Sequence, residues 1–391
     1  MKVSIKVSRS VLTRLQPSQE TDRDVMETAS DQLTKGRAAL SEGTTESNER
    51  AVAHFERAAA LEPQFAPAYI ALATAYLQRY EERSDGRWLE RAIAAAEKAI
   101  DLDPLPAEAY LALGRAYRST GLLRKEKELW QRRVQIDPDD AIARTRGGWV
   151  LWFTGRPDEA LSWLHAAAAQ RPGDKWVQRW VYFFLGNANL ALSNHAEAER
   201  WYRKQLDLHP DHSSAQAGLI WSLLAANKDD EARSEQTRFQ RNAYDGDRHA
   251  LKLADIEYFL NQDQSASQHA REALSEPDER YWPRGFLATT ILGALWWPSD
   301  RLAATTHLAS SERIDRDRLL GGDEGYMPHI DLAAIQAIRG EIRTACRSLQ
   351  AAITAGWRYP ALAVRDRLFE SLRTDPEFIS LMRGSVTDQP K

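Results

Sequence analysis

The stretch PLPAEAYLALGRAYRSTGLLRKEKELWQRRVQIDP, residues 104–138, decides the fold. It begins and ends at a proline, and Pro172 follows after the same interval of 34 residues. Each of these prolines closes an apolar, alanine-rich run and precedes another, which is typical of consecutive helices because proline is excluded from helix interiors. A period of this length accommodates one helix, a turn and a second helix that packs back on the first.

The order of residues inside this stretch resembles the tetratricopeptide repeat, in which an aromatic residue, a Leu-Gly pair and a Tyr precede a second half with Ala, an aromatic residue and Pro. The matching residues are Tyr110, Leu113, Gly114, Tyr117, Trp130 and Pro138. The resemblance implies an all-α fold, a right-handed α-solenoid of antiparallel helix pairs, about eight or nine of them, with a short C-terminal helical cap. It also implies binding of another protein rather than catalysis.

Comparable units can be followed along most of the chain and divide it into five regions. We expect an N-terminal arm and lead-in helix, well-defined repeats, degenerate helical repeats, C-terminal capping helices and a disordered tail. Their boundaries are residues 1–29, 30–244, 245–358, 359–383 and 384–391, in that order. A cap is expected because the last repeat would otherwise expose its apolar face.

The composition limits the classes of function. A net charge of −4 gives no basic footprint for nucleic acid. The single cysteine, Cys346, excludes a disulfide framework and a multi-cysteine metal site. No run reaches the apolar length of a membrane span, and residues 1–8 lack the apolar core of a secretory signal. We therefore expect a cytoplasmic protein that contacts neither membrane nor nucleic acid.

Motifs that carry chemistry are missing from the sequence. There is no glycine-rich phosphate loop, no GxSxG, no HExxH and no CxxC. His209 and His212 are close together, but two turn histidines without a third ligand do not make a zinc site, and we expect both to be solvated. Cys346 occupies a small-residue position of the ninth unit, where we expect a buried thiol. The sequence predicts no catalytic residue, no metal, no cofactor and no enzyme activity.

The functional prediction rests on the placement of the aromatic residues, which include 13 tryptophans. At about 100° per residue, the packing face of each first helix lies opposite a second face that lines the concave groove in tetratricopeptide proteins. The residues predicted on that second face are Trp149, Trp152, Phe153, Trp176, Trp180, Phe183, Asn187 and Trp221. So many rings exceed what a monomer usually leaves exposed, so we predict a partner-binding surface. Burial of some rings by the twist of the superhelix is the alternative.

Arg115 and Arg118 fall on the same face one unit earlier. The pair could hold an acidic residue or a C-terminal carboxylate by charge-assisted hydrogen bonds, or both could be solvated. The Lys and Asn clamp by which some family members grip chaperone tails has no counterpart here, so chaperone binding is not predicted.

Three functions remain open on the sequence. The first is a non-catalytic scaffold or adaptor that holds a peptide segment of a partner protein in the concave aromatic groove. The second is a regulatory or ligand-sensing module, because the beginning and end of the repeat region resemble the repeat halves of bacterial signalling enzymes and transcription regulators. The third is an enzyme with a cleft that no motif reveals. An exposed aromatic face could also form a homo-oligomer.

Overall fold

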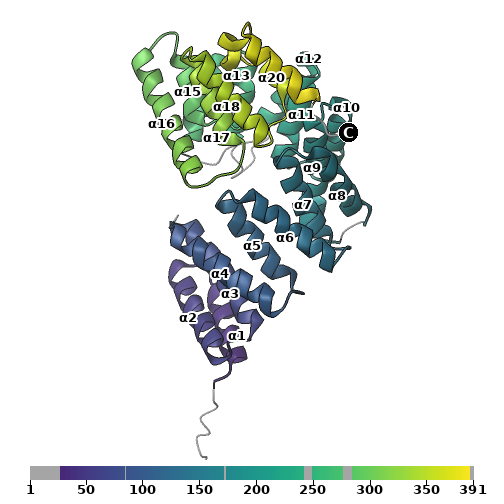
Figure 1. The fold of residues 1–391 in the computed structure, drawn as a ribbon, viewed down its shortest axis with the longest axis vertical. Coiled ribbons are helices and arrows are strands. Elements are labelled where there is room, and N and C mark those ends of the chain that lie inside the picture. The colour runs from purple at the N-terminus through teal and green to yellow at the C-terminus, as the bar shows by residue number, and fades with distance from the viewer. Residues whose placement is uncertain (1–26, 84, 171–172, 242–248, 276–283, 388–391) are drawn as a thin grey trace, which may run out of the picture. The chain divides into compact units, whose positions relative to one another are not determined.

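The structure is a computed structural model that describes residues 27–83, 85–170, 173–241, 249–275 and 284–387 (Figure 1). The expected N-terminal arm lies almost wholly outside these ranges, as do Pro172 and residues 388–391.

Regular structure in these ranges is entirely helical. The helices are α1 (Ala29–Leu40), α2 (Thr45–Leu61), α3 (Ala66–Arg83), α4 (Gly86–Leu102), α5 (Ala107–Ser119), α6 (Leu123–Ile136), α7 (Ala141–Phe153), α8 (Pro157–Ala169), α9 (Lys175–Ala191), α10 (His195–Leu208), α11 (Ser213–Ala225), α12 (Asp229–Arg241), α13 (His249–Phe259), α14 (Asp263–Ala273), α15 (Ala288–Trp296), α16 (Arg301–Leu320), α17 (Met327–Ile338), α18 (Ile342–Thr354), α19 (Pro360–Ala363), the 3-10 helix η1 (Arg367–Leu372) and α20 (Pro376–Thr387). From α1 to α18 they pack as nine successive pairs within the described ranges, which confirms the predicted solenoid.

In four of the pairs, a glycine in the first helix closely approaches an aromatic ring in the second; these pairs are α1/α2, α5/α6, α7/α8 and α9/α10. A Cβ atom on Gly114 would lie 2.4 Å from the ring of Trp130, and one on Gly186 would lie 2.5 Å from the ring of Tyr202. Only glycine permits this spacing, because any side chain would occupy the position of the ring. The Leu-Gly and aromatic positions of the repeat are therefore the two halves of one contact.

The turn inside each pair is also repeated. Ser193, Asn227 and Asn261 lie 34 residues apart and share a positive φ of 60–62°. In the last two of these turns, the backbone amide of the next residue donates a hydrogen bond to the carbonyl five residues before it. The acceptors are the carbonyl oxygens of Leu223, at 2.9 Å, and Glu257, at 2.8 Å. This bond is the signature of the Schellman motif that ends a helix. The period thus continues into the region from residue 245, where the sequence signature is weak.

The chain divides into two compact units after Pro104. The first unit contains α1 to α4, and the second contains α5 to α20. All features described below belong to the second unit.

The second unit closes on itself. Helices α13 to α18 continue the stack in order, and the chain after α18 then returns to α7. The indole Nε1 of Trp152 donates a 2.9 Å hydrogen bond to the hydroxyl of Tyr359, which lies 207 residues further along the chain. Gly155 and Gly356 approach so closely that a Cβ atom on the former would lie 2.7 Å from the Cα of the latter. The late repeats therefore continue the superhelix, and the segment after them folds back.

The returning segment follows the period of the repeats that it crosses. Arg365 donates to a carbonyl in the last turn of α11 and to both carboxylate oxygens of Asp229, at 2.7 and 2.8 Å. Arg367 donates to the equivalent carbonyl of α13, at 3.4 Å, and to Asp263, at 2.5 and 3.2 Å. Asp229 and Asp263 are 34 residues apart, so two arginines separated by one residue bind two successive turns in the same way.

The C-terminal cap consists of α19, η1 and α20, with Leu368, Phe369 and Phe378 buried beneath it. Helix α20 ends at Thr387, so the tail boundary expected at residue 384 lies inside this helix. No helix in the described ranges combines the length and the apolar character needed to cross a membrane.

Candidate functional site

The residues predicted to line the groove separate into a buried set and a partly exposed set. The buried residues, with their exposed fractions, are Trp152 (3%), Phe153 (8%), Phe183 (6%), Asn187 (0%) and Trp221 (0%). The expectation that these five side chains face an open groove is wrong. They are covered by other parts of the same chain.

For Trp152, Phe153 and Trp221, contacts with distant parts of the second unit are the physical reason for the burial. Trp152 is hydrogen-bonded to Tyr359, and the Phe153 ring lies 4.9 Å from that of Tyr326. Trp221 lies beneath Arg284, whose Cζ atom is 5.3 Å from the ring centre.

Two of the buried residues have contacts within the repeats themselves. Asn187 accepts a 2.8 Å hydrogen bond from the hydroxyl of Tyr202 in the same helix pair. Phe183 lies between the rings of Trp180 and Tyr202, with centroid separations of 5.8 and 6.1 Å. These side chains therefore belong to the core.

The remaining predicted residues lie at the surface of three successive first helices. Arg115 and Arg118 are on α5, Trp149 is on α7, and Trp176 and Trp180 are on α9. Arg115 is exposed and the other four are partly exposed. We call these five residues, together with Arg146 of α7, the Arg–Trp face.

Guanidinium groups and indole rings are paired across this face. The Cζ atom of Arg118 lies 4.3 Å from the ring centre of Trp149, and that of Arg146 lies 4.1 Å from the ring centre of Trp176. Such cation–π contacts are worth about 0.5–2 kcal/mol, more when they are shielded from water. They orient both the cations and the rings.

Arg118 is also held by an acidic partner. It forms an ion pair with Glu126 of α6, a carboxylate that is fully buried and that accepts a 3.2 Å hydrogen bond from the Trp130 indole. Glu126 is thus committed to Arg118 and Trp130.

Arg146 is the residue that the sequence reasoning missed. No acceptor in the described ranges takes a hydrogen bond or an ion pair from its guanidinium, and its Nε atom is inaccessible to solvent. Burial, followed by repulsion from Arg118, lowers the pKa of Arg146 to about 10, so the group remains charged at neutral pH. A charge in such a position is costly unless something pairs with it.

The spacing of Arg146 could have revealed it. Arg146, Trp149 and Phe153 follow each other at i, i+3 and i+7, which places them on one helix face.

Two of the tryptophans on the Arg–Trp face stack on phenylalanine rings. Trp149 stacks on Phe153 with a centroid separation of 5.2 Å, and Trp180 stacks on Phe184 at 5.8 Å. His212 meets the ring of Trp180 edge-on at 4.8 Å. The expectation that His212 is solvated is wrong, because it is buried and its Nδ1 accepts the Ala215 amide at the start of α11.

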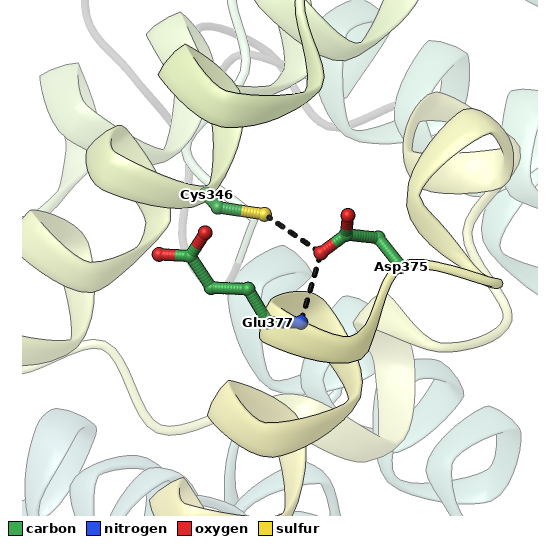
Figure 2. A group of neighbouring side chains, drawn as sticks. All are labelled: Cys346, Asp375 and Glu377. Carbon is green, nitrogen blue, oxygen red and sulfur yellow. Dashed lines mark hydrogen bonds between the residues drawn. The ribbon is translucent and has the colours of Figure 1, made fainter.

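Cys346 of α18 faces Asp375 and Glu377 at the start of α20 (Figure 2). Its Sγ donates to Asp375 Oδ1 at 3.8 Å, and the same oxygen accepts the amides of Glu377 and Phe378 at 2.9 and 3.1 Å. Burial and the two carboxylates raise the pKa of Cys346 to about 11. Asp375 Oδ1 therefore caps the first turn of α20, and the thiol is a third donor to the same oxygen.

Comparison with known proteins identifies the repeats. Models described as tetratricopeptide repeats match residues 83–141 and 181–212. A solved tetratricopeptide repeat protein from Parabacteroides merdae ATCC 43184 is 12% identical, with a TM-score of 0.55, and the match covers 68% of this chain and 97% of that one. This likeness shows the fold alone.

Two further structures match shorter parts of the chain. YrrB, described as a TPR protein with an unusual peptide-binding site, is 24% identical over 48% of this chain and 90% of its own, with a TM-score of 0.39. Pseudomonas aeruginosa pilF is 22% identical over 53% of this chain and 89% of its own, with a TM-score of 0.41. No curated protein matches the sequence.

Proposed function

We propose that this chain, a tetratricopeptide-repeat protein, is a non-catalytic scaffold that binds a segment of a partner protein on the Arg–Trp face. The observation that carries the proposal is the set of three tryptophans, Trp149, Trp176 and Trp180, which stay partly exposed on adjacent helices although the closure buries their neighbours. Trp and Arg are the residues most enriched among the energetic centres of protein interfaces.

Rigidity favours binding at this face. The rings of Trp149 and Trp180 are stacked on Phe153 and Phe184, and that of Trp176 contacts Arg146. A partner that binds to preordered side chains loses less conformational entropy than one that must immobilise them. The face is bounded where Tyr326 covers Phe153, so the segment bound would follow α5, α7 and α9 rather than the whole superhelix.

The groups on this face suit binding rather than bond-breaking chemistry. The carboxylate of Glu126 is buried in an ion pair with Arg118 and is not placed to exchange protons with a substrate. Arginine and tryptophan side chains bind and orient, but they are poor proton carriers at neutral pH.

A direct binding measurement tests the proposal. Partners would first be captured from a lysate of the source organism, purified, and titrated calorimetrically against the wild type and the double variant Trp149→Ala/Trp176→Ala. Loss of two interface anchors should weaken binding at least about tenfold, since a single anchor can be worth 2 kcal/mol or more. The matched control is Leu208→Ala, which removes a side chain on α10 that is 55% exposed and lies off this face.

The controls define the contrary result. Circular dichroism should show equal helix content and thermal midpoints for all three proteins. A partner that binds the double variant as tightly as the wild type, with Leu208→Ala also unchanged, would place the binding surface elsewhere.

A further inference from the structure

We infer that the segment bound by the Arg–Trp face is acidic, and that a partner Asp or Glu side chain pairs with Arg146. The inference rests on the proposed function and adds the chemistry of the partner. It starts from the charge of Arg146.

The two carboxylates that act electrostatically on Arg146 are Glu126 and Asp174, and both are occupied by other groups. Glu126 pairs with Arg118 and accepts the Trp130 indole N–H. Asp174 begins α9, where its Oδ1 accepts the amides of Trp176 and Val177 at 2.8 and 3.0 Å. Neither carboxylate is hydrogen-bonded to Arg146. The positive charge of Arg146 therefore has no carboxylate partner in the described ranges.

Arg146 is the group that a partner carboxylate would satisfy. Its contact with Trp176 offsets part of the cost of burial but supplies no oxygen acceptor for the guanidinium N–H groups. A guanidinium offers donors in a planar fork that matches a carboxylate, and such charge-assisted hydrogen bonds are the strong ones. The Nε atom of Arg146 is inaccessible to water, and a lower local dielectric increases the interaction of opposite charges there.

The arrangement of the arginines favours several acidic side chains over one terminal carboxylate. Arg115 and Arg118 lie on α5 and Arg146 on α7, so the positive groups are spread over two helices. Packed helices are separated by about 8–10 Å, and an extended chain advances about 3.3 Å per residue. Acidic residues about two or three positions apart in one segment would therefore reach both helices.

Peptide selection tests the inference. A library of random dodecapeptides, displayed with the peptide C-terminus joined to the carrier protein, would be selected against the wild type, Arg146→Gln and Arg200→Gln. Arg200 is the matched control, because it is an exposed arginine on α10 that pairs with Glu197. Peptides selected by the wild type and by Arg200→Gln should be enriched in Asp and Glu at the spacing given above, and Arg146→Gln should lose this enrichment.

A synthetic consensus peptide, acetylated and amidated at its ends, then provides the affinities. Binding should weaken at least about tenfold in Arg146→Gln and by a smaller factor in Arg146→Lys, which keeps the charge but not the fork. Raising the salt concentration should weaken binding to the wild type more than to Arg146→Gln. Arg115→Gln, at an exposed position, repeats the test with a variant whose folding is least at risk.

Each contrary outcome has a distinct meaning. Selected peptides without acidic enrichment would overturn the inference and leave the proposed function standing. Acidic peptides that bind Arg146→Gln and Arg115→Gln as tightly as the wild type would also overturn it. If binding requires a free C-terminal carboxylate, the inference is overturned, because the face then recognises a chain terminus and not acidic side chains. If no peptide is selected at all, the proposed function fails together with the inference.

Discussion

Arg365 and Asp229 are 136 residues apart in the sequence, yet the guanidinium donates to both carboxylate oxygens, at 2.7 and 2.8 Å. The pair joins the returning C-terminal segment to the first turn of α12. Its repetition by Arg367 and Asp263, one helix pair later, shows that the segment is adapted to the period of the repeats. These contacts close the second unit.

Arg365→Ala should lower the free energy of unfolding of the second unit by about 1–2 kcal/mol, and Asp229→Ala should lower it less. The arginine also donates to a carbonyl at the end of α11, which Asp229→Ala leaves in place. Urea denaturation of both single variants and the double variant measures the coupling, expected at about 0.5–1 kcal/mol. Arg313→Ala, which removes an exposed ion pair within α16, should change stability by less than about 0.5 kcal/mol. Additive single effects would contradict a direct pair.

Gly186→Ala should destabilise the second unit by about 1–3 kcal/mol, because the added methyl group overlaps the Tyr202 ring and forces the two helices apart. Gly173→Ala is the control, since a Cβ atom at that position meets nothing within 4 Å. Thermal unfolding followed by circular dichroism compares the two. A Gly186→Ala protein as stable as the control would show that the ring can move aside without cost.

The stability of the second unit should depend on the ionisation of Asp255. Burial raises the pKa of this carboxyl to about 7, although Arg284 lies 2.9 Å from its Oδ1 atom. The unfolded chain has a value of about 3.9. The folded state therefore binds the proton more tightly, and the stabilisation is complete below about pH 4 and is lost as the pH rises through about 7.

Asp255→Asn removes this titration. Between pH 4.5 and 7.5 its free energy of unfolding should fall less steeply than that of the wild type, whatever its absolute value, and chemical denaturation at a series of pH values measures the difference. Contributions from other titrating groups are shared by the two proteins. Parallel stability curves would show that Arg284 keeps Asp255 ionised throughout.

Cys346 should be almost unreactive in the folded protein. With its pKa raised to about 11, the thiolate fraction at pH 8 is about a hundredfold or more below that of an ordinary thiol, and burial slows the reaction further. A disulfide reagent should titrate one thiol rapidly in guanidinium chloride and very slowly in buffer.

Asp375→Asn gives a second check on the thiol. Asparagine retains the cap of α20 while removing one negative charge beside the sulfur, so the thiol should react faster than in the wild type. Rapid reaction of the folded wild type would contradict the raised pKa.

The helix pairs were predictable because their determinants are local. Gly186 and Tyr202 belong to one repeat, and their spacing recurs in Gly114 and Trp130. Even where the signature fades, Asn261 preserves the turn. Periodicity reports which side chains share a helix face, and this was sufficient for the order and approximate bounds of the elements.

The closure was not predictable, and the errors at Trp152, Phe153 and Trp221 follow from contacts between distant parts of the chain. The helical pattern predicted Trp221 opposite the packing face of its helix, but it carries no information about Arg284, which covers the ring. The same pattern predicted Trp149 on this face, and its ring is partly exposed in the structure. Side chains on one face thus divide into core and surface according to contacts between residues far apart in the sequence.

The hydrogen bond between Trp152 and Tyr359 changes how the second unit should fold. An open array of repeats depends on contacts between neighbours, so it can nucleate anywhere and lose units one at a time from its ends. Here the last elements are fastened across 207 residues, and this loop must be closed before its contacts contribute. We expect slow folding for an all-helical protein, and unfolding in which the first and last repeats of this unit are lost together.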